Sequence, residues 1–285
     1  MIGNVIRDRK GVTVSRIAET FERRRGAGRT ALMPYLTMGY PARESALSLV
    51  PAIVEAGADV IELGIPFSDP LADGATIQAT AQQALSNGMT LSLCLEQAAA
   101  LRARGINAPF VTMGYYNPIF QMGTARFADH AASAGVDGVI VPDLPPEESD
   151  ALRTPLHARG IDLIFLLAPT HDPARIRLVA DHTSGFLYLV SLTGVTGARD
   201  RLPPGLESFI TRVRAMTDRP LAVGFGISTP GQAAQVARIA DGVIVGSALL
   251  RAIGASEDPV TSARAFVASL RAGVDSVNRN NPGIA

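Results

Sequence analysis

Short apolar runs rich in β-branched residues alternate with longer amphipathic stretches along most of the chain. The runs are apolar throughout rather than alternately apolar and polar, which is typical of parallel strands whose outer face is covered by helices. Most gaps between runs have room for one helix and two loops. The pattern predicts eight strands, at residues 31–37, 59–63, 110–114, 138–141, 162–167, 186–191, 221–224 and 242–245.

The gap after the second predicted strand is the longest, and we place two helices in it, at residues 76–86 and 91–104. Residues 14–25 are expected to form a helix that plugs the floor of the sheet, and residues 259–277 a closing helix. Alternating strands and helices in this number predict an α/β fold, a (β/α)₈ TIM barrel with an N-terminal helix and extra helices; an open doubly wound sheet is the alternative. We expect one domain over residues 1–285, with a polar leader at 1–13 and a flexible tail at 278–285.

Three segments, at residues 55–63, 134–141 and 239–246, resemble one another. Each combines a helix end, a turn in which Gly or Ala precedes Asp, and a buried strand. The repeat supports one domain built from similar units, and no Pro/Gly/Ser-rich linker interrupts it.

Composition and charge exclude several classes of protein. Of the 285 residues 47% are hydrophobic, and 26 basic residues balance 26 acidic ones, so no basic field is available for nucleic acid. No apolar run approaches the roughly 18–20 residues of a membrane span, and no signal peptide opens the chain. A single cysteine, Cys94, excludes an internal disulfide. We therefore expect a soluble, cytoplasmic protein with no nucleic-acid or membrane partner.

The basic residues exclude further chemistries. Lys10 is the only lysine and precedes the first predicted strand, so the barrel has no lysine for a Schiff base or for pyridoxal phosphate. Of the four histidines only His171 follows a strand directly, so we expect no metal site. An aldol-type cleavage would need a substrate that supplies its own electron sink, such as an indole protonated at C3.

Two carboxylates lie where a barrel builds its active site, after the C-terminal ends of the strands. Glu62 ends an apolar strand, where a carboxylate is costly unless it is used or paired with a neighbouring loop amide. Asp73 lies in the following Gly/Pro-rich loop, where it could also be an ordinary turn or N-cap residue. Together they could divide the work, one as acid and base and the other as an ionised anchor.

Glycine-rich loops follow the last three predicted strands and predict a phosphate site. Glycines let backbone N–H groups approach an anion, and a helix that begins at Ser247 would add its dipole. Barrels commonly bind phosphate in the loops after the seventh and eighth strands. Each glycine alone could mark a tight turn. Residues 193–196, which include Thr196, could act as a mobile lid.

The segment Ile61-Glu-Leu-Gly-Ile-Pro-Phe-Ser-Asp-Pro-Leu-Ala-Asp-Gly-Ala-Thr-Ile-Gln78 resembles the signature of the tryptophan synthase α subunit family. Five more segments resemble that family in the same order, and together they span nearly the whole chain. They read PYLTMGYP (34–41), YYNP (115–118), VPDLPPEES (141–149), GVTG (194–197) and GFGIS (224–228).

The resemblance implies a lyase of tryptophan biosynthesis that cleaves indole-3-glycerol phosphate to indole and glyceraldehyde 3-phosphate. It implies that Glu62 takes the glycerol hydroxyl proton and is the acid at indole C3. Asp73 would hold the indole N–H and stabilise positive charge on the ring. Phosphate would be bound by Gly197, Gly226, Gly246 and Ser247. Other contacts would be made by Tyr188, Tyr115, Phe225, Tyr35, Ile140 and Leu166; without the family, Tyr115 and Phe225 could be plain core aromatics.

The resemblance also implies a partner, a β subunit in an α₂β₂ heterotetramer, which would carry the pyridoxal phosphate; no cofactor is expected in this chain. The docking loops would include Pro66, Asp69, Tyr116, Asn117 and Pro118. Two positions depart from other members, Leu192 in the lid approach and Tyr40, and they bear on the lid rather than on the reaction.

Three alternatives stand beside this hypothesis. The first is another phosphate-binding barrel of the same pathway, similar to an indoleglycerol-phosphate synthase or to an isomerase; a synthase of that kind would rely on a catalytic lysine, which the barrel lacks. A weakly catalytic or non-catalytic activator of a β subunit would have no need of both Glu62 and Asp73. A barrel with no ligand does not explain three glycine-rich loops on one face.

Overall fold

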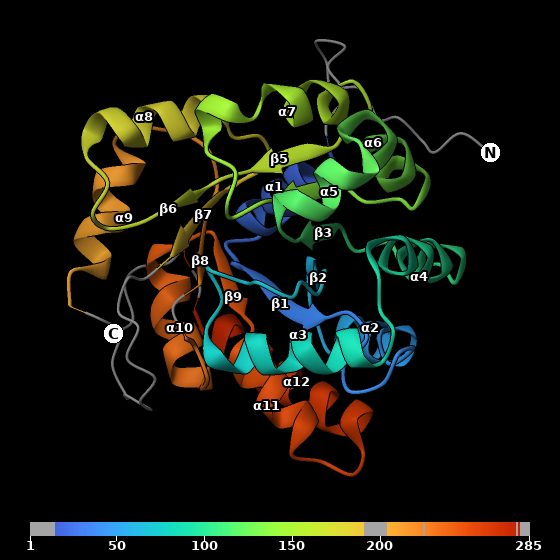
Figure 1. Cartoon of the computed structure of the whole chain (residues 1–285). Coiled ribbons are helices and arrows are strands. Elements are labelled where there is room, and N and C mark those ends of the chain that lie inside the picture. Colours follow the sequence, from blue (N-terminus) through green and yellow to red (C-terminus); the bar gives the residue numbers. More distant parts are fainter. Residues whose placement is uncertain (1–14, 191–203, 225, 278, 280–285) are drawn as a thin grey trace.

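The computed structural model describes residues 15–190, 204–224, 226–277 and 279. Parallel strands form an inner barrel and helices surround it (Figure 1). The hydrogen-bonded order is β5-β4-β3-β2-β1-β9-β8-β7-β6. The predicted TIM barrel is confirmed. The strands are β1 (Ala31–Thr37), β2 (Ile61–Gly64), β3 (Phe110–Met113), β4 (Gly138–Ile140), β5 (Asp162–Ile164), β6 (Leu166–Leu167), β7 (Leu187–Val190), β8 (Leu221–Gly224) and β9 (Gly242–Val245).

The barrel closes through one short segment. The single strand predicted at residues 162–167 is divided at Phe165 into β5, which pairs with β4, and β6, which pairs with β7. Phe165 bridges the division, because its carbonyl accepts a hydrogen bond of 3.1 Å from the Tyr188 N–H. The two ends of the sheet are therefore one continuous stretch of chain, and an open sheet is excluded.

Thirteen helical segments accompany the described strands, and the predicted helices agree with them to within a residue or two. The segments are α1 (Arg16–Gly26), α2 (Ala46–Glu55), α3 (Ala75–Ser86), α4 (Leu91–Ala103), α5 (Tyr116–Met122), α6 (Thr124–Ser133), the 3₁₀ helix η1 (Pro146–Glu148), α7 (Asp150–His157), α8 (Pro173–His182), α9 (Leu206–Arg214), α10 (Pro230–Ile239), α11 (Ser247–Gly254) and α12 (Pro259–Asp275).

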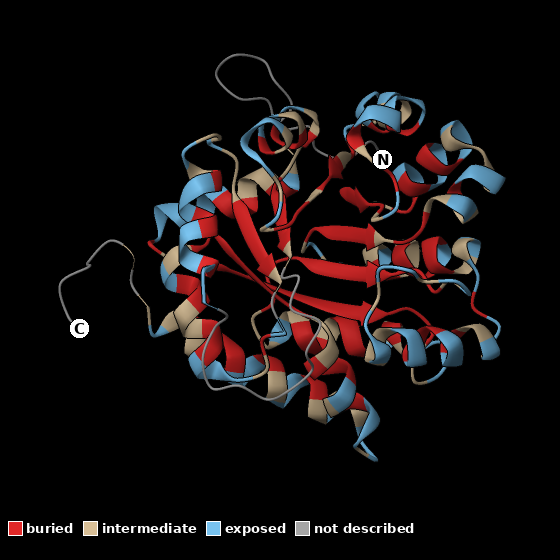
Figure 2. Ribbon diagram, turned by 60° about the vertical axis from the view of Figure 1, so that its left-hand side comes forward, coloured by how far each residue is buried: buried red, intermediate tan, exposed pale blue. Residues whose placement is uncertain are grey.

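Side chains alternate between the inside of the barrel and the layer beneath the helices. Met33, Val111 and Ile164 belong to an inner cluster, whereas their neighbours Leu32 and Leu163 pack outward. Both faces of the strands are buried, as the red strands in Figure 2 show. This double burial is the reason that the strand sequences are apolar throughout.

Helix α1 plugs the floor of the barrel, as the sequence predicts. Ser15 caps it by accepting a hydrogen bond from the Ala18 N–H. Ile17 and Phe21 are buried within the inner cluster, and the ring of Phe21 lies 5.6 Å from that of Phe186. The plug fits because Gly138 has no side chain: a Cβ there would come within 2.8 Å of Ile17.

The three repeated segments each contain an aspartate, and these aspartates have the same structural role. Each lies just before its strand, and its carboxylate accepts the backbone N–H that starts the neighbouring strand: Asp59 from Leu32, Asp137 from Phe110 and Asp241 from Leu221, at 2.8–2.9 Å. We call these three residues the aspartate clamps. Each also pairs with two arginines: Asp59 with Arg24 and Arg271, Asp137 with Arg16 and Arg102, and Asp241 with Arg214 and Arg279.

Two further expectations can be compared with the described part of the chain. None of its helices is long and apolar enough to cross a membrane, and it holds no group of three or more metal-ligating side chains.

Tyr116, Asn117 and Pro118 were expected in a loop, and that prediction is wrong. They form the first turn of α5, where proline is tolerated because the first N–H groups of a helix have no partner within it.

Candidate functional site

Glu62 lies on the inner face of the barrel near the C-terminal end of β2. It is level with Tyr35 on β1 and with Val111 on β3, and its side chain is fully buried. Neither carboxylate oxygen has a hydrogen-bond partner among the described residues, so none of the described loop amides bonds it. Burial raises the pKa of Glu62 to about 8. The group therefore holds a proton at neutral pH, and nothing in the described part of the chain hydrogen-bonds it.

Asp73 lies in the loop between β2 and α3, where the Tyr115 hydroxyl hydrogen-bonds its side chain. The same hydroxyl accepts a 2.9 Å bond from the Ala72 N–H, which ties the loop to the start of α5. Asp73 is not the helix cap, because Gly74 occupies that position. Burial raises the pKa of Asp73 to about 6, and the bond from Tyr115 opposes part of this rise. At neutral pH Asp73 is therefore mostly ionised, whereas Glu62 is protonated.

Two buried tyrosines interact electrostatically with both carboxylates. Burial raises the pKa of Tyr35 on β1, and the negative charges of Asp73 and Glu62 raise it further. Burial raises the pKa of Tyr188 on β7, and electrostatic interactions with Glu62, Tyr35 and Asp73 raise it further. The four groups act on one another electrostatically and form one site. Both tyrosine hydroxyls stay neutral and can act as hydrogen-bond donors.

Glycines at the strand ends make room for these rings. A Cβ on Gly64, at the end of β2, would lie 2.0 Å from the Tyr35 hydroxyl oxygen. A Cβ on Gly224, at the end of β8, would lie 2.8 Å from that of Tyr188. The role of Gly64 could not be read from the sequence, because the ring that excludes its side chain belongs to another strand.

Replacing Gly64 by alanine is expected to lower the free energy of unfolding by about 1–3 kcal/mol, since the added methyl group overpacks a buried ring. Urea denaturation measures this change. Gly74→Ala is the matched control, because a Cβ there meets open space. Adding Tyr35→Leu to Gly64→Ala should recover part of the loss; a Gly64→Ala protein as stable as the wild type would contradict the crowding.

Apolar groups wall the site. The ring of Tyr115 stacks on that of Phe67, with centroids 5.1 Å apart, and Phe67 is a lining residue that the sequence did not single out. Ile140 on β4 belongs to the inner cluster, and Leu166 on β6 packs against it. Apolar and aromatic side chains of this kind commonly line sites for aromatic ligands.

The predicted phosphate residues that the structure describes lie at the same mouth of the barrel. Gly226 follows β8, is exposed and has a φ of +64°, a conformation that favours glycine. Gly246 follows β9, and Ser247 begins α11, so the expected helix start is confirmed. A Cβ on Gly246 would lie 3.5 Å from Tyr35, so this region borders the carboxylates. Thr196, Gly197, Phe225 and Leu192 lie outside the described residues.

The expected docking residues lie around the same mouth. Pro66 is buried, Asp69 is exposed and accepts a 2.5 Å hydrogen bond from Ser68, and Asn117 is exposed. Two large apolar side chains that the sequence did not single out are also exposed, Leu71 by 93% and Phe120 by 62%. The rings of Phe120 and Tyr116 contact each other, with centroids 5.9 Å apart. Pro118 of the same helix is half-buried. The departure Tyr40 packs over Gly254 of α11, away from both carboxylates.

Comparisons with known proteins show which family this chain resembles. The family model described as tryptophan synthase alpha chain matches residues 21–277. The tryptophan synthase alpha chain of Chloroflexus aggregans is 54% identical and that of Chloroflexus aurantiacus 56%. These alignments cover 93% and 92% of this chain and 100% and 99% of the relatives.

Solved structures match equally well. Tryptophan synthase subunit alpha from Legionella pneumophila is 40% identical with a TM-score of 0.86, over 93% of this chain and 100% of that one. A chain of Mycobacterium tuberculosis tryptophan synthase is 38% identical with a TM-score of 0.85, over 92% and 98%.

Proposed function

Since the chain belongs to the tryptophan synthase alpha chain family, and so is the lyase of the α reaction of tryptophan biosynthesis, we propose that Glu62 and Asp73 carry that reaction. The substrate is indole-3-glycerol phosphate and the products are indole and glyceraldehyde 3-phosphate. The observation that carries the assignment is the buried Glu62 carboxylate, which has no partner among the described residues. A carboxylate of that kind is costly to keep unless a ligand uses it.

Glu62 acts first as an acid. With a pKa of about 8 it is protonated at neutral pH, and it donates its proton to C3 of the indole. The ring becomes cationic and can accept electrons. The Glu62 carboxylate then takes the hydroxyl proton from the carbon attached to C3. The bond between that carbon and C3 breaks, its electrons restore the neutral indole, and the hydroxyl-bearing carbon becomes the aldehyde. Glu62 ends protonated, as it began.

Asp73 stabilises the charge that develops in this step. Its pKa of about 6 leaves it ionised at neutral pH, so it can accept the indole N–H and offset the positive charge on the ring. The Tyr115 hydroxyl positions it. Tyr188, Tyr35, Ile140 and Leu166 enclose the ring and exclude water. Phe225 belongs to the same proposal.

The phosphate is assigned to the other side of the mouth. The Ser247 N–H at the start of α11 points along a helix dipole that favours an anion. Gly226 and Gly246 let backbone N–H groups approach it. Gly197 completes the group, with Thr196 in the lid.

The pH dependence of kcat/KM is expected to be bell-shaped, with its highest values between pH about 6 and about 8. Activity falls as the pH drops through the pKa of Asp73, because the protonated aspartate no longer offsets charge. It falls again as the pH rises through the pKa of Glu62, because the glutamate loses the proton that it must donate. Initial rates of indole release from pH 5 to pH 9 test this. Asp73→Asn should abolish the acidic limb; a limb that persists in that variant would assign it to another group.

The family implies a β subunit as partner, and we extend the proposal to an α₂β₂ heterotetramer. The docking surface would join Pro66, Asp69, Tyr116, Asn117 and Pro118. This chain would use no cofactor and work in the cytoplasm, with pyridoxal phosphate held by the β subunit. The single lysine, Lys10, is consistent with that division.

Indole release from indole-3-glycerol phosphate by the purified chain, with and without a β subunit, tests the function. We expect slow release by the chain alone and strongly faster release in the complex. A chain that accelerates the β subunit's reaction but releases no indole under either condition would instead be a non-catalytic activator.

A further inference from the structure

A cavity of about 540 Å³ lies at the opposite end of the barrel from the candidate active site. Its lining comes from segments that precede strands: Arg25 near the end of α1, Gly28 before β1, Arg214 and Asp218 before β8, and Asp241 before β9, with Arg279 after α12. The active-site glycines lie at the other ends of the same strands. The cavity is therefore separate from the catalytic mouth, and the reaction does not use it.

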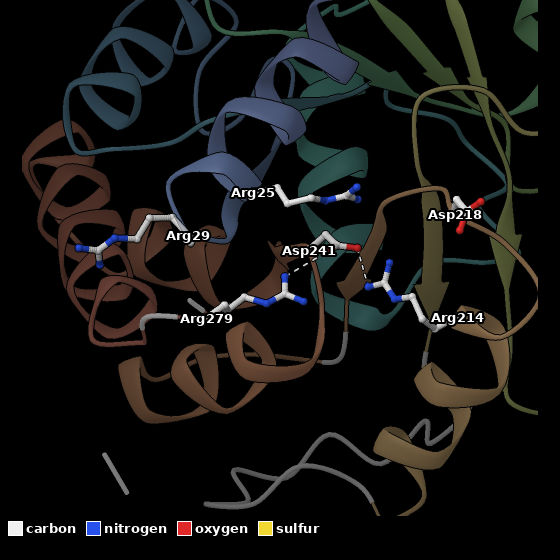
Figure 3. Close-up of a pocket in the computed structure, with 7 residues that line it drawn as sticks. Arg25, Arg29, Arg214, Asp218, Asp241 and Arg279 are labelled. Atoms are coloured by element: carbon white, nitrogen blue, oxygen red, sulfur yellow. Dashed lines mark hydrogen bonds and ion pairs between the residues drawn. The ribbon is translucent and has the colours of Figure 1, made fainter. Parts of the chain in front are cut away.

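The charge in this cavity is unbalanced. Figure 3 shows Arg25, Arg214 and Arg279 gathered around the carboxylate of Asp241, while Arg29 points away. Asp241 pairs with Arg214 at 2.5 Å and with Arg279 at 3.0 Å, and Arg29 pairs with Asp275 outside the cavity. The carboxylate of Asp241 thus faces three guanidinium groups, and with Arg29 and Asp218 the lining holds four arginines against two aspartates, whereas the whole chain has equal numbers of acidic and basic residues.

Stability alone does not account for Arg25. It is exposed, and its side chain has no hydrogen bond or ion pair with any described residue. The clamp at Asp241 is already complete, because its carboxylate also accepts the Leu221 N–H. Among the described residues each of the other two clamps also pairs with two arginines. Arg25 is therefore an additional cation beside a finished structural unit.

The lining also limits the kind of ligand. Apart from Gly28, every described residue of the lining is charged, which favours a charged, hydrophilic ligand over an apolar one. Guanidinium groups recognise phosphate oxygens through paired N–H donors. Across the cavity, the exposed Asp218 carboxylate has no partner among the described residues and can accept a hydrogen bond from a hydroxyl group.

We propose that this cavity binds the phosphate group of a small hydrophilic molecule, with Arg25 as the cation that the fold leaves available and Arg214 and Arg279 beside it. Two sources of that chemistry exist, free inorganic phosphate and a phosphate ester rich in hydroxyl groups. The volume exceeds the needs of phosphate alone and leaves room for a sugar near Asp218.

The test follows backbone amide signals of the full chain by NMR during titration with inorganic phosphate and, separately, with a hexose phosphate. Gly28 reports on this cavity, and Ser247 reports on the catalytic mouth. We expect a saturable shift of the Gly28 signal and an affinity at least about tenfold weaker in Arg25→Glu. Arg23→Glu is the matched control, an exposed arginine of the same helix that lies outside the cavity lining, and it should bind as the wild type does.

Asp218→Asn distinguishes the two sources. If a sugar hydroxyl binds there, the substitution weakens hexose phosphate binding; if phosphate alone binds, removing the negative charge strengthens it. No saturable shift at Gly28 up to about 10 mM of either ligand, or equal affinity in Arg25→Glu and the wild type, would overturn the proposal.

Discussion

Replacing Glu62 by glutamine is expected to lower kcat for indole release by a factor of about 10³. Glutamine has the same shape but can neither donate the proton to C3 nor take the hydroxyl proton. The buried tyrosines Tyr35 and Tyr188, whose pKa values Glu62 influences, have raised pKa values, so neither can replace it as a base at neutral pH. Single-turnover measurements with and without a β subunit give the comparison.

The same variant provides its own control for folding. The pKa of Glu62 rises from 4.5 to about 8 on folding, so between these values the folded wild type holds a proton that the unfolded chain has lost. Glu62 therefore makes the wild type lose stability as the pH rises through this range, and this contribution is absent in Glu62→Gln. The stability of the variant relative to the wild type should increase between pH about 5 and about 8. An inactive variant without this trend would indicate damage to the fold; near wild-type cleavage would refute the catalytic role.

Replacing Asp73 by asparagine is expected to lower kcat/KM about a hundredfold, because the charge that offsets the cationic ring is lost while the loop keeps its shape. Tyr115→Phe should have a smaller effect in the same direction, since it removes only the hydroxyl that positions Asp73. Steady-state rates at pH 7 measure both.

Asp150→Asn serves as the control for Asp73→Asn. Asp150 begins α7, is exposed and pairs only with Arg153 among the described residues, so its replacement should leave the rate unchanged. If Asp73→Asn cleaves as fast as this control, the ring charge is stabilised by another group.

The sequence predicts the barrel well because burial of both strand faces gives each strand an unbroken apolar run. The sequence-based prediction fails where contacts with neighbouring strands or side chains set the limits of a strand. The second strand was expected from residue 59 but begins at Ile61, because the Asp59 side chain is bound to Leu32 and to two arginines. The division at Phe165 depends on β4 and β7 pairing with the two halves of one segment.

At the candidate site, position relative to the strand ends was enough to single out Glu62 and Asp73 as candidates, because the carboxyl ends of parallel strands meet at one mouth. The stacking of Phe67 on Tyr115 and the space that Gly64 leaves for Tyr35 could not be predicted, since each depends on the distance between residues of different strands. The exposure of Leu71 and Phe120 was missed for a similar reason: the sequence alone does not say which apolar residues the fold leaves uncovered.

The aspartate clamps have a consequence for the order in which the chain assembles. Each joins the starts of two consecutive strands, across 27, 27 and 20 residues, so it can form from one strand–helix–strand unit without the rest of the molecule. Contacts between β1 and β9 instead require almost the entire chain, and such distant pairings are slow to form. We therefore expect a nascent chain to form successive clamped units as they leave the ribosome, and ring closure between β1 and β9 to follow them.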